Sequence, residues 1–386
     1  MTFTPEPTLE LGTLSELRLE HHFRHFAGEA PWLLCTSDVE AYRLDELLEL
    51  ADERTLALWQ GLTLGYTAPS GHPLLRAEIA GLYEHVEPDD VLTCAGADEA
   101  IFLAMSAILR RGDHAVVAWP GYESLASLAG ATGAEVSRLH LDPESGWGLD
   151  LEALRRVLRR ETRLIVVNYP HNPTGTLLDR ATLEGLAALA GEIGAVLLCD
   201  EVYRLLEYDP GERLPAGVDL GRHGLSIGVM SKAFGLAGLR VGWLASRDRD
   251  LLQRVAALKD YTSGCLSAPS EVLALVALRS RERVLARSRA LLARNLALLD
   301  SFFADWEGVL EWVRPRAGCV AYPRLLTGEP VEQFAARLTA EEGVMLVPGA
   351  VYGDFDNRFR IGFGHADMPE ALARLDRFLR RRGGGA

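Results

Sequence analysis

Short apolar segments alternate with amphipathic segments through the middle of this 386-residue chain. Apolar stretches of strand length lie at residues 91–94, 114–118, 135–140, 164–168, 195–199, 225–229 and 241–245. Between them, hydrophobic residues recur with helical spacing at residues 97–110, 151–159 and 180–193, and in the stretch that ends at Ala131. Strands that alternate with helices form parallel sheets with helices on both faces. The pattern therefore predicts an α/β fold with a mostly parallel, seven-stranded sheet covered by helices.

The spacing changes on either side of this alternation. Helical spacing dominates residues 45–60, 74–86, 248–261 and 269–306, and the last stretch is long enough to cross between domains. The C-terminal part alternates again, with strands expected at 318–323, 344–347 and 359–363 and helices at 331–342 and 369–381. We expect an N-terminal arm with part of the small domain (1–45), a large domain (46–285) and a smaller α+β C-terminal domain (286–386).

Composition and charge exclude several classes of partner. A net charge of −14 and a pI near 5.3 argue against nucleic acid and anionic membranes. No secretory signal is visible, and no apolar run reaches the roughly 18 residues that span a bilayer. Five scattered cysteines without CxxC spacing predict reduced thiols, no metal site and a cytoplasmic location. The histidines of residues 21–26 lack further ligands, so we expect an exposed arm or helix there.

One lysine is unusual in its setting. Lys232 is one of only two lysines among 40 basic residues, and glycines and Arg240 follow it closely. Unlike a guanidinium, an ammonium can lose its proton and attack a carbonyl. A lysine nucleophile beside an anion site suggests a Schiff base with a phosphorylated aldehyde cofactor.

A second candidate feature is the turn between the strand at 91–94 and the helix that follows. Gly96, Ala97 and Asp98 lie in this turn, where backbone N–H groups and the helix dipole can hold a phosphate. We assign Asp98 a backbone role or an N-cap, because its charge would repel a dianion.

Polar residues also follow the later strands, where ligands of parallel sheets collect. Tyr122 opens a helix, where its ring could stack on a flat ligand, although a tyrosine there is more often part of the core. Asn172-Pro173 places an amide at a strand end, in a turn where a cis proline is plausible. Asp200 closes an apolar strand, so its carboxylate needs a cationic partner, such as a protonated ring nitrogen. Tyr203 follows three residues later.

Together these residues resemble the class I/II aminotransferases, fold-type I enzymes that depend on pyridoxal phosphate and include aspartate aminotransferase. The resemblance runs from about residue 35 to the C-terminus, in the family's order and spacing. It is carried by Tyr66, Gly71, Gly96-Ala97, Tyr122, Asn172-Pro173-Thr174-Gly175, Asp200, Tyr203, Ser231-Lys232, Arg240 and Arg360. A single such motif is weak evidence for the family, whereas seven motifs in the family's order and spacing are strong evidence.

The resemblance implies how the large domain binds the cofactor ring. Lys232 is expected to form the internal aldimine and then to move the proton between the substrate α-carbon and the cofactor. Asp200 is expected to pair with the pyridinium nitrogen, which keeps the ring an electron sink. Asn172 and Tyr203 would bond the phenolate oxygen, and Tyr122 would stack on the ring.

The resemblance also implies how the phosphate and the substrate are held. Arg240, Ser231 and the backbone of residues 96–98 would hold the phosphate, with Tyr66 of the partner subunit in a homodimer. Arg360 is expected to bind the substrate α-carboxylate bidentately, next to Asn172. The implied substrates are an amino acid and a 2-oxo acid.

The sequence departs from the family pattern in three places. Val229 stands where Ser or Gly is usual, which removes one phosphate hydroxyl, and Asp98 stands where Ser or Thr is frequent. The arginine of dicarboxylate-specific members would fall near Ser263, which argues against an aspartate specialist. Ser267 could contact the phosphate across the dimer, and Lys259 is interpreted as a solvated surface group rather than a substrate contact.

The acidic residues of the segment 35–42 suggest a substrate preference. This segment occupies the place where family members cover the substrate, so Asp38 or Glu40 could select a cationic side chain. An exposed acidic loop is the alternative interpretation.

Three functions compete. The first is an aminotransferase that works by ping-pong chemistry. The second is a pyridoxal-phosphate lyase or cyclase on an arginine-derived amino acid, because residues 317–324 and 347–364 also resemble capreomycidine synthases. The third, a non-catalytic sensor domain of a transcription regulator, is disfavoured because only about 35 residues precede the matched region, too few for a DNA-binding domain.

Overall fold

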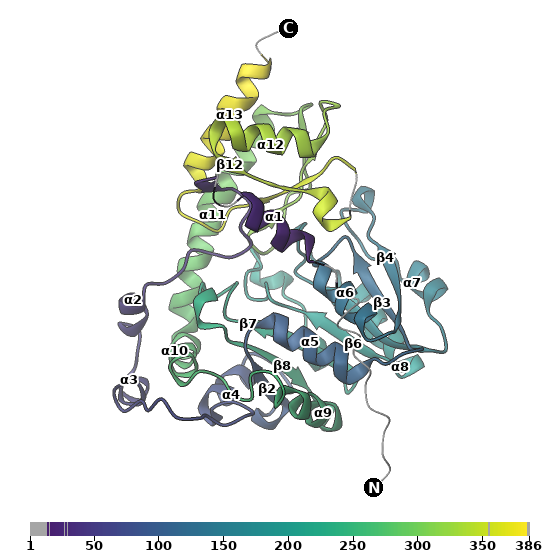
Figure 1. Ribbon diagram of the computed structural model, residues 1–386, viewed down its shortest axis with the longest axis vertical. Coiled ribbons are helices and arrows are strands. Elements are labelled where there is room, and N and C mark those ends of the chain that lie inside the picture. Colours follow the sequence, from purple (N-terminus) through teal and green to yellow (C-terminus); the bar gives the residue numbers. More distant parts are fainter. Residues whose placement is uncertain (1–13, 15, 27, 29, 354–355, 384–386) are drawn as a thin grey trace.

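A computed structural model describes residues 14, 16–26, 28, 30–353 and 356–383. Its centre is a seven-stranded sheet with the order β2-β8-β7-β6-β5-β3-β4 (Figure 1). Only β8 runs antiparallel to its neighbours β2 and β7. The predicted mostly parallel, seven-stranded sheet is therefore confirmed. The strands are β2 (Val91–Cys94), β3 (His114–Trp119), β4 (Glu135–His140), β5 (Thr162–Asn168), β6 (Val196–Asp200), β7 (Gly224–Val229) and β8 (Gly242–Ser246).

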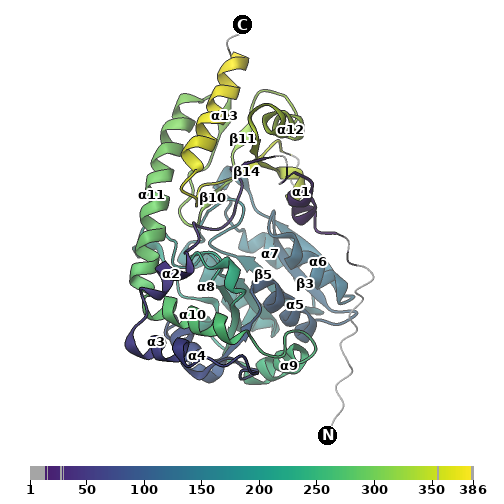
Figure 2. The same ribbon diagram turned by 60° about the vertical axis from the view of Figure 1, so that its left-hand side comes forward.

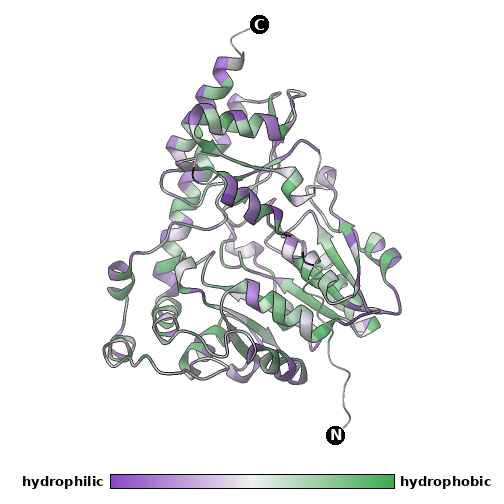
Figure 3. Cartoon of the chain, in the orientation of Figure 1, coloured by the Kyte–Doolittle hydropathy of each residue, from purple (hydrophilic) through white to green (hydrophobic). Residues whose placement is uncertain are grey.

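Helices cover this sheet on both faces, because both faces of its strands are apolar. Along β3, Ala115 and Val117 belong to one core cluster, whereas Val116 and Ala118 belong to another. The first cluster lies under α5 (Ala97–Ile108), α6 (Glu123–Ala131) and α9 (Arg249–Lys259), and the second under α7 (Leu151–Val157) and α8 (Arg180–Ile193). Figure 3 shows the strands as mostly hydrophobic. Since side chains alternate along a strand, this double burial explains the continuous apolar runs of the sequence.

The C-terminal elements form a second body above the sheet (Figure 1). It contains a three-stranded sheet, in the order β10-β14-β13, packed with α12 (Val331–Glu342) and α13 (Met368–Gly383). The strands are β10 (Val320–Ala321), β13 (Val347–Pro348) and β14 (Phe359–Gly362). Figure 2 shows α11 (Arg281–Asp305) running along the side of the molecule from α10 (Ala268–Arg279) up to α13.

The remaining elements are short. Two-stranded sheets join β1 (Trp32–Leu33) to β12 (Val344–Met345) and β9 (Leu310–Glu311) to β11 (Arg324–Leu325). The first of these pairs ties the N-terminal part to the C-terminal body. The division at residues 45 and 285 stays a prediction. The other helices are α1 (Arg18–Phe26), α2 (Leu44–Leu48), α3 (Glu53–Gln60) and α4 (Pro73–Ala80), and the 3₁₀ helices are η2 (Pro88–Asp90), η3 (Pro143–Ser145), η4 (Pro210–Glu212), η5 (Gly217–Leu220), η6 (Ala237–Leu239) and η7 (Gly349–Tyr352).

Two long helices predicted from the sequence are each divided. The stretch 45–60 contains α2 and α3, because the Asp52 side chain accepts a hydrogen bond from Thr55 N and starts a new helix. The stretch 269–306 is divided at Ser280, whose hydroxyl donates to the Leu50 carbonyl at 2.8 Å. Hydrophobic periodicity continues across both breaks, so it could not locate them. The strand expected at 318–323 is also reduced to β10.

Candidate active site

A cavity of about 230 Å³ lies at the carboxyl ends of β5, β6 and β7. Parallel strands place their following loops at this edge of the sheet, as the sequence predicted. The residues that line the cavity include most of the predicted site and are Leu19, Glu20, Phe23, Ser37, Asp38, Ala97, Asp98, Ile101, Tyr122, Asn168, Asn172, Asp200, Val202, Val229, Ser231, Lys232, Ala237 and Arg240. Among the residues that the structure describes, no cluster of three His, Cys, Asp or Glu could hold a metal ion.

Lys232 reaches the cavity from the turn after β7. Its ammonium donates to the Ser37 hydroxyl at 2.9 Å and lies 5.9 Å from the centre of the Tyr203 ring. Burial lowers the pKa of the Lys232 ammonium, because the charged form loses its hydration. A lysine with a lowered pKa has a larger fraction of free amine, which is the form that attacks a carbonyl.

Asp200 is a buried carboxylate at the end of β6, and it lines the same cavity. Within the described residues, the one hydrogen bond of its carboxylate is a long one, 3.4 Å from Val202 N, and the carboxylate forms no ion pair there. Burial raises the pKa of Asp200 to about 7. A carboxylate in this position is suited to a cationic ligand, since such a ligand would restore its ordinary ionisation.

Asn168 fixes the strand ends around Asp200, and the sequence analysis did not single it out. Its amide donates to the Asp200 carbonyl at 2.9 Å, and its oxygen accepts from Asn172 N at 2.8 Å. These bonds hold the turn 169–173 against β6. The Asn172-Pro173 peptide in this turn is cis, as suggested from the sequence.

The turn before α5 forms an anion site with Arg240. Gly96 is the N-cap of this 12-residue helix, with φ of 92°. A Cβ on Gly96 would lie 2.7 Å from Arg240 Nη2, so the guanidinium approaches bare backbone. Backbone N–H groups, the helix dipole and a guanidinium converge here, beside Ser231.

Asp98 brings a negative charge into this site. Asp98 is not the N-cap that we considered, because Gly96 takes that position and Asp98 lies in the first helical turn. Its carboxylate accepts a hydrogen bond from the Tyr122 hydroxyl at 2.9 Å and lies 3.7 Å from Arg240 Nη2. Tyr122 and Arg240 are therefore joined through Asp98 at the cavity wall.

Arg360 lies fully buried behind the cavity, on β14. Its Nη1 donates to the Tyr352 hydroxyl at 2.5 Å and to the Asn172 side-chain oxygen at 3.4 Å. Its Nε and Nη2 donate to the Cys35 carbonyl at 3.1 and 2.6 Å. The fork that is expected to bind a carboxylate is thus occupied by backbone.

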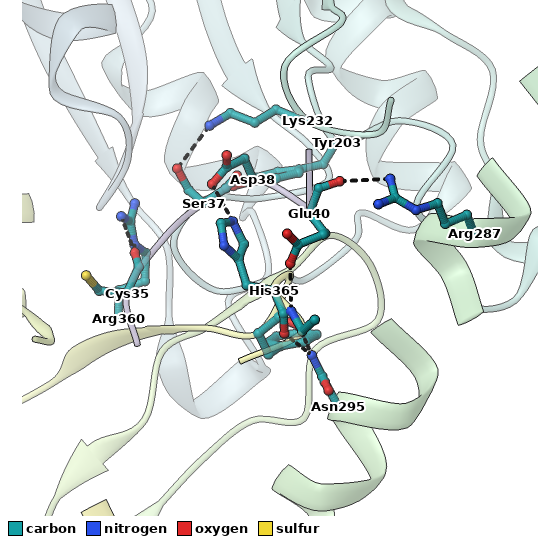
Figure 4. A network of polar contacts seen from close by, with 12 residues as sticks. Cys35, Ser37, Asp38, Glu40, Tyr203, Lys232, Arg287, Asn295, Arg360 and His365 are labelled. Atoms are coloured by element: carbon teal, nitrogen blue, oxygen red, sulfur yellow. Dashed lines mark hydrogen bonds and ion pairs between the residues drawn. The ribbon is translucent and has the colours of Figure 1, made fainter. Parts of the chain in front are cut away.

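Residues 35–40, which we call the covering segment, lie over these groups (Figure 4). Ser37 accepts from Lys232 through its hydroxyl and from the Tyr203 hydroxyl through its carbonyl, the latter at 2.7 Å. Tyr203 is fully buried and is not among the residues that line the cavity. Its expected bond to a cofactor oxygen would replace the bond to Ser37. Asp38 lines the cavity and contacts His365 at 3.3 Å.

Several residues singled out from the sequence lie outside the cavity. The Tyr66 side chain is 101% exposed and does not line this cavity. Ser263 hydrogen-bonds Glu99 through its backbone N–H and its hydroxyl, and Ser267 is the N-cap residue of α10. The interpretation of Lys259 as a surface group is wrong, because it is 1% exposed and donates to the Pro69 and Gly264 carbonyls.

Other residues of the site were missed. The helix α1 was expected as an exposed arm or helix, and its Leu19, Glu20 and Phe23 line the cavity. Ser37 and His365 belong to loops without periodicity, so only the three-dimensional structure brings them to Lys232 and Asp38. For His365, the one signal available from the sequence was its position shortly after Arg360 in the chain.

Comparisons with known proteins point to one enzyme family, but the similar proteins catalyse different reactions. The family model of the class I and II aminotransferases matches residues 34–375. Capreomycidine synthase of Streptomyces vinaceus is 38% identical over 323 residues, which cover 82% of this chain and 82% of that protein. Aspartate/prephenate aminotransferase of Thermus thermophilus is 30% identical over 344 residues, covering 84% and 86%.

Solved structures extend these similarities. A PLP-dependent aminotransferase from Streptococcus suis superposes with a TM-score of 0.90 at 30% identity, covering 95% of this chain and 98% of that one. The PLP-dependent cyclase OrfR superposes with a TM-score of 0.86 at 29% identity, covering 99% and 100%. Aminotransferases and cyclases are both represented among these neighbours.

Proposed function

Because this chain belongs to the class I and II aminotransferase family, we propose that it moves an amino group from an L-amino acid to a 2-oxo acid by ping-pong chemistry. The observation that supports this proposal is that two buried ionisable groups, Lys232 and Asp200, line one cavity. The amine of Lys232 has a lowered pKa, and the carboxylate of Asp200 lacks a cationic partner among the described residues.

Pyridoxal phosphate is the cofactor of this protein, as the family and its structural neighbours establish. When bound, it supplies an aldehyde for an amine and a ring that accepts the electron pair of the broken bond. The residues fit this group. Asp200 suits its ring nitrogen, and the anion site of Gly96, Ala97, Ser231 and Arg240 suits its phosphate.

We assign the remaining groups by their positions. Tyr122 would lie against the ring, and Asn172 and Tyr203 would donate hydrogen bonds to its phenolate oxygen. Lys232 would attack the aldehyde and later hold the proton that leaves the α-carbon, for which a pKa nearer neutrality is favourable. Arg360, next to Asn172, would bind the α-carboxylate after the Cys35 carbonyl withdraws. Asp38 would contact the substrate from the covering segment.

We also propose a homodimer in which Tyr66 completes the phosphate site of the partner subunit. Leu64, Tyr66 and Tyr261 are 86%, 101% and 90% exposed, and large exposed apolar side chains of this kind mark protein interfaces. The Thr67 hydroxyl donates to the Leu266 carbonyl at 3.0 Å, which joins the loops that carry these side chains.

The five cysteines are free, which agrees with the cytoplasmic location that we propose. The described residues include no helix long and apolar enough to cross a membrane.

A lyase or cyclase that acts on an arginine-derived amino acid is the second candidate. It is favoured by the 38% identity to capreomycidine synthase and by the superposition on OrfR. Both candidates would use the same cofactor residues. Product analysis separates them, because an aminotransferase consumes a 2-oxo acid for each amino acid and a cyclase or lyase consumes none. A reaction that proceeds at full rate without an oxo acid would contradict the transfer proposal.

A further inference from the structure

The covering segment is held against the loop that follows β14. A Cβ on Gly364 would lie 2.0 Å from the Asp38 carbonyl, and a Cβ on Gly362 would lie 2.0 Å from the Thr36 carbonyl. The two backbones can approach this closely only because neither glycine carries a side chain. The position of Asp38 is therefore set by the loop that contains His365.

Further hydrogen bonds fix this loop and the covering segment to each other. Glu40 N donates to the Gly364 carbonyl, and the Glu40 carboxylate accepts from Ala366 N, both at 2.8 Å. The buried Asn295 amide on α11 donates to the Phe363 carbonyl at 2.9 Å and to the His365 carbonyl at 2.8 Å (Figure 4). His365 thus extends from a rigid backbone toward Asp38.

Asp38 and His365 contact each other at the cavity, and the contact is an ion pair when His365 is protonated. Asp38 Oδ1 lies 3.3 Å from His365 Nε2, and both side chains are 30% exposed. Burial alone would raise the pKa of Asp38, but the hydrogen bond and charge of His365, together with the charge of Lys232, bring it below its ordinary value. The hydrogen bond to Asp38 raises the pKa of His365, and the charges of Asp38, Glu40 and Asp367 act in the same direction.

The other carboxylates that line the cavity have different surroundings. Asp98 is engaged by Tyr122 and Arg240, and Asp200 faces the place of the cofactor ring. Glu20 lines the cavity from α1, where the residue is exposed. On the covering segment, the Glu40 carboxylate accepts from Ala366 N, whereas Asp38 lines the cavity, next to Ser37, which contacts the Lys232 ammonium.

We propose that Asp38 recognises a cationic side chain of the substrate and that His365 is the positioning residue that holds Asp38 and adjusts its effect with pH. This inference rests on the proposed pyridoxal-phosphate reaction with an amino acid. When His365 is protonated, the pair has no net charge and attracts a cation weakly. When His365 is neutral, Asp38 contributes an uncompensated negative charge. The preference for a cationic amino acid therefore rises with pH.

L-Arginine and L-citrulline form a matched pair of probes, because they have nearly the same shape and differ in the charge of the side-chain end. The holoenzyme is titrated with each, and the change in cofactor absorbance gives the two dissociation constants. Their ratio cancels the shared titration of the α-amino group. The wild-type protein should prefer arginine by about tenfold or more at high pH, the effect of one charge-assisted hydrogen bond.

The variants test the two residues separately. Asp38→Asn should bring the ratio near one at all pH values. His365→Asn and His365→Gln should give a ratio that is independent of pH between about 5.5 and 8.5, where histidine titrates, whereas the wild-type ratio rises across this range. If His365 had a purely structural role, its variants would bind both ligands less tightly by the same factor and would keep the pH dependence of the ratio. The exposed Asp300→Asn, far from the cavity in a pair with Arg314, is the matched control and should leave the ratio unchanged.

Two outcomes would overturn this assignment. One is equal binding of arginine and citrulline by the wild-type protein, or binding of neither by a protein that responds to methionine. The other is an Asp38→Asn protein with the wild-type ratio. Absence of an absorbance change with any amino acid would instead contradict the proposed function itself, so the two failures are distinguishable.

Discussion

The guanidinium of Arg360 donates two hydrogen bonds to the carbonyl oxygen of Cys35, from Nε at 3.1 Å and from Nη2 at 2.6 Å. Nε and Nη2 form the edge with which arginine donates two parallel hydrogen bonds to the two oxygens of a carboxylate. A substrate carboxylate and the Cys35 carbonyl therefore compete for the same edge of Arg360. Substrate binding should require the covering segment to shift at Cys35.

Replacement of Arg360 by lysine tests this carboxylate role. Arg360→Lys keeps the charge but loses the two-pronged geometry, so we expect amino acid affinity to fall by about 10- to 100-fold. The affinity for an amine that lacks the α-carboxylate should change much less. Equal losses for the acid and the amine, in titrations followed by cofactor absorbance, would contradict the assignment. Arg314→Lys, an exposed arginine paired with Asp300, is the control.

Asp98 should weaken the binding of the phosphate. Its carboxylate lies 3.7 Å from Arg240 Nη2, so it partly neutralises the cation that a phosphate needs. Asp98→Asn keeps an acceptor for the Tyr122 hydroxyl and removes the charge. We expect pyridoxamine phosphate to bind about tenfold more tightly, as measured by fluorescence quenching of the cofactor-free protein. An unchanged or lower affinity would show that Asp98 does not oppose the phosphate.

The buried carboxylate of Asp200 should make the cofactor-free protein less stable at high pH. Its pKa of about 7 lies above the ordinary value of 3.8, so the folded protein keeps a proton that the unfolded chain loses. The free energy of unfolding should therefore fall as the pH rises from about 4 to about 7. Above this range, cofactor-free Asp200→Asn should be more stable than the wild type by up to about 4 kcal/mol.

Urea unfolding of the cofactor-free proteins at several pH values measures this difference. With the cofactor bound, the wild type should instead be more stable than Asp200→Asn, because the variant loses the partner of the ring nitrogen. Equal pH dependence of the cofactor-free wild type and variant would contradict the burial of an unpaired carboxylate. The exposed Asp300→Asn should follow the wild type.

Lys259 should contribute to stability through two loops. Its buried ammonium donates to the Pro69 and Gly264 carbonyls. Burial raises the pKa of Glu271, and the charge of Lys259 is among the influences that oppose this rise. Lys259→Met would leave both carbonyls without this donor, and we expect a loss of about 3 kcal/mol in the free energy of unfolding. The exposed Arg254→Met on the same helix should change stability by less than about 0.5 kcal/mol, and a similar loss in both variants would contradict this role.

The central sheet was accessible from the sequence because its strands are apolar on both faces and are separated by helical periods. Strands at 135–140 and helices at 180–193 and 331–342 were predicted with the boundaries that the structure has. The breaks at Asp52 and Ser280 were not, because they depend on a side-chain cap and on a contact with the distant Leu50 carbonyl. Periodicity carries no information about either.

The site was predictable where a residue type is demanded by local chemistry. Lys232 and Asp200 could be singled out because a rare lysine and a carboxylate at the end of an apolar strand both require explanation. The partners of these groups were not predictable, since Ser37 lies 195 residues from Lys232 and His365 lies 327 residues from Asp38. The burial of Lys259 was missed for the same reason, because Pro69 is 190 residues away.

The half-reaction of the holoenzyme distinguishes amino-group transfer from cyclisation or elimination. The protein is mixed with a reactive amino acid in the absence of an oxo acid, and the products and the cofactor spectrum are followed together. For an aminotransferase, we expect one equivalent of 2-oxo acid per active site, a cofactor left in its amine form, and recovery of the starting spectrum when an oxo acid is added. Lys232→Ala should fail to complete this cycle. Continued turnover to a cyclic or eliminated product, without an oxo acid and without accumulation of the amine form, would contradict amino-group transfer.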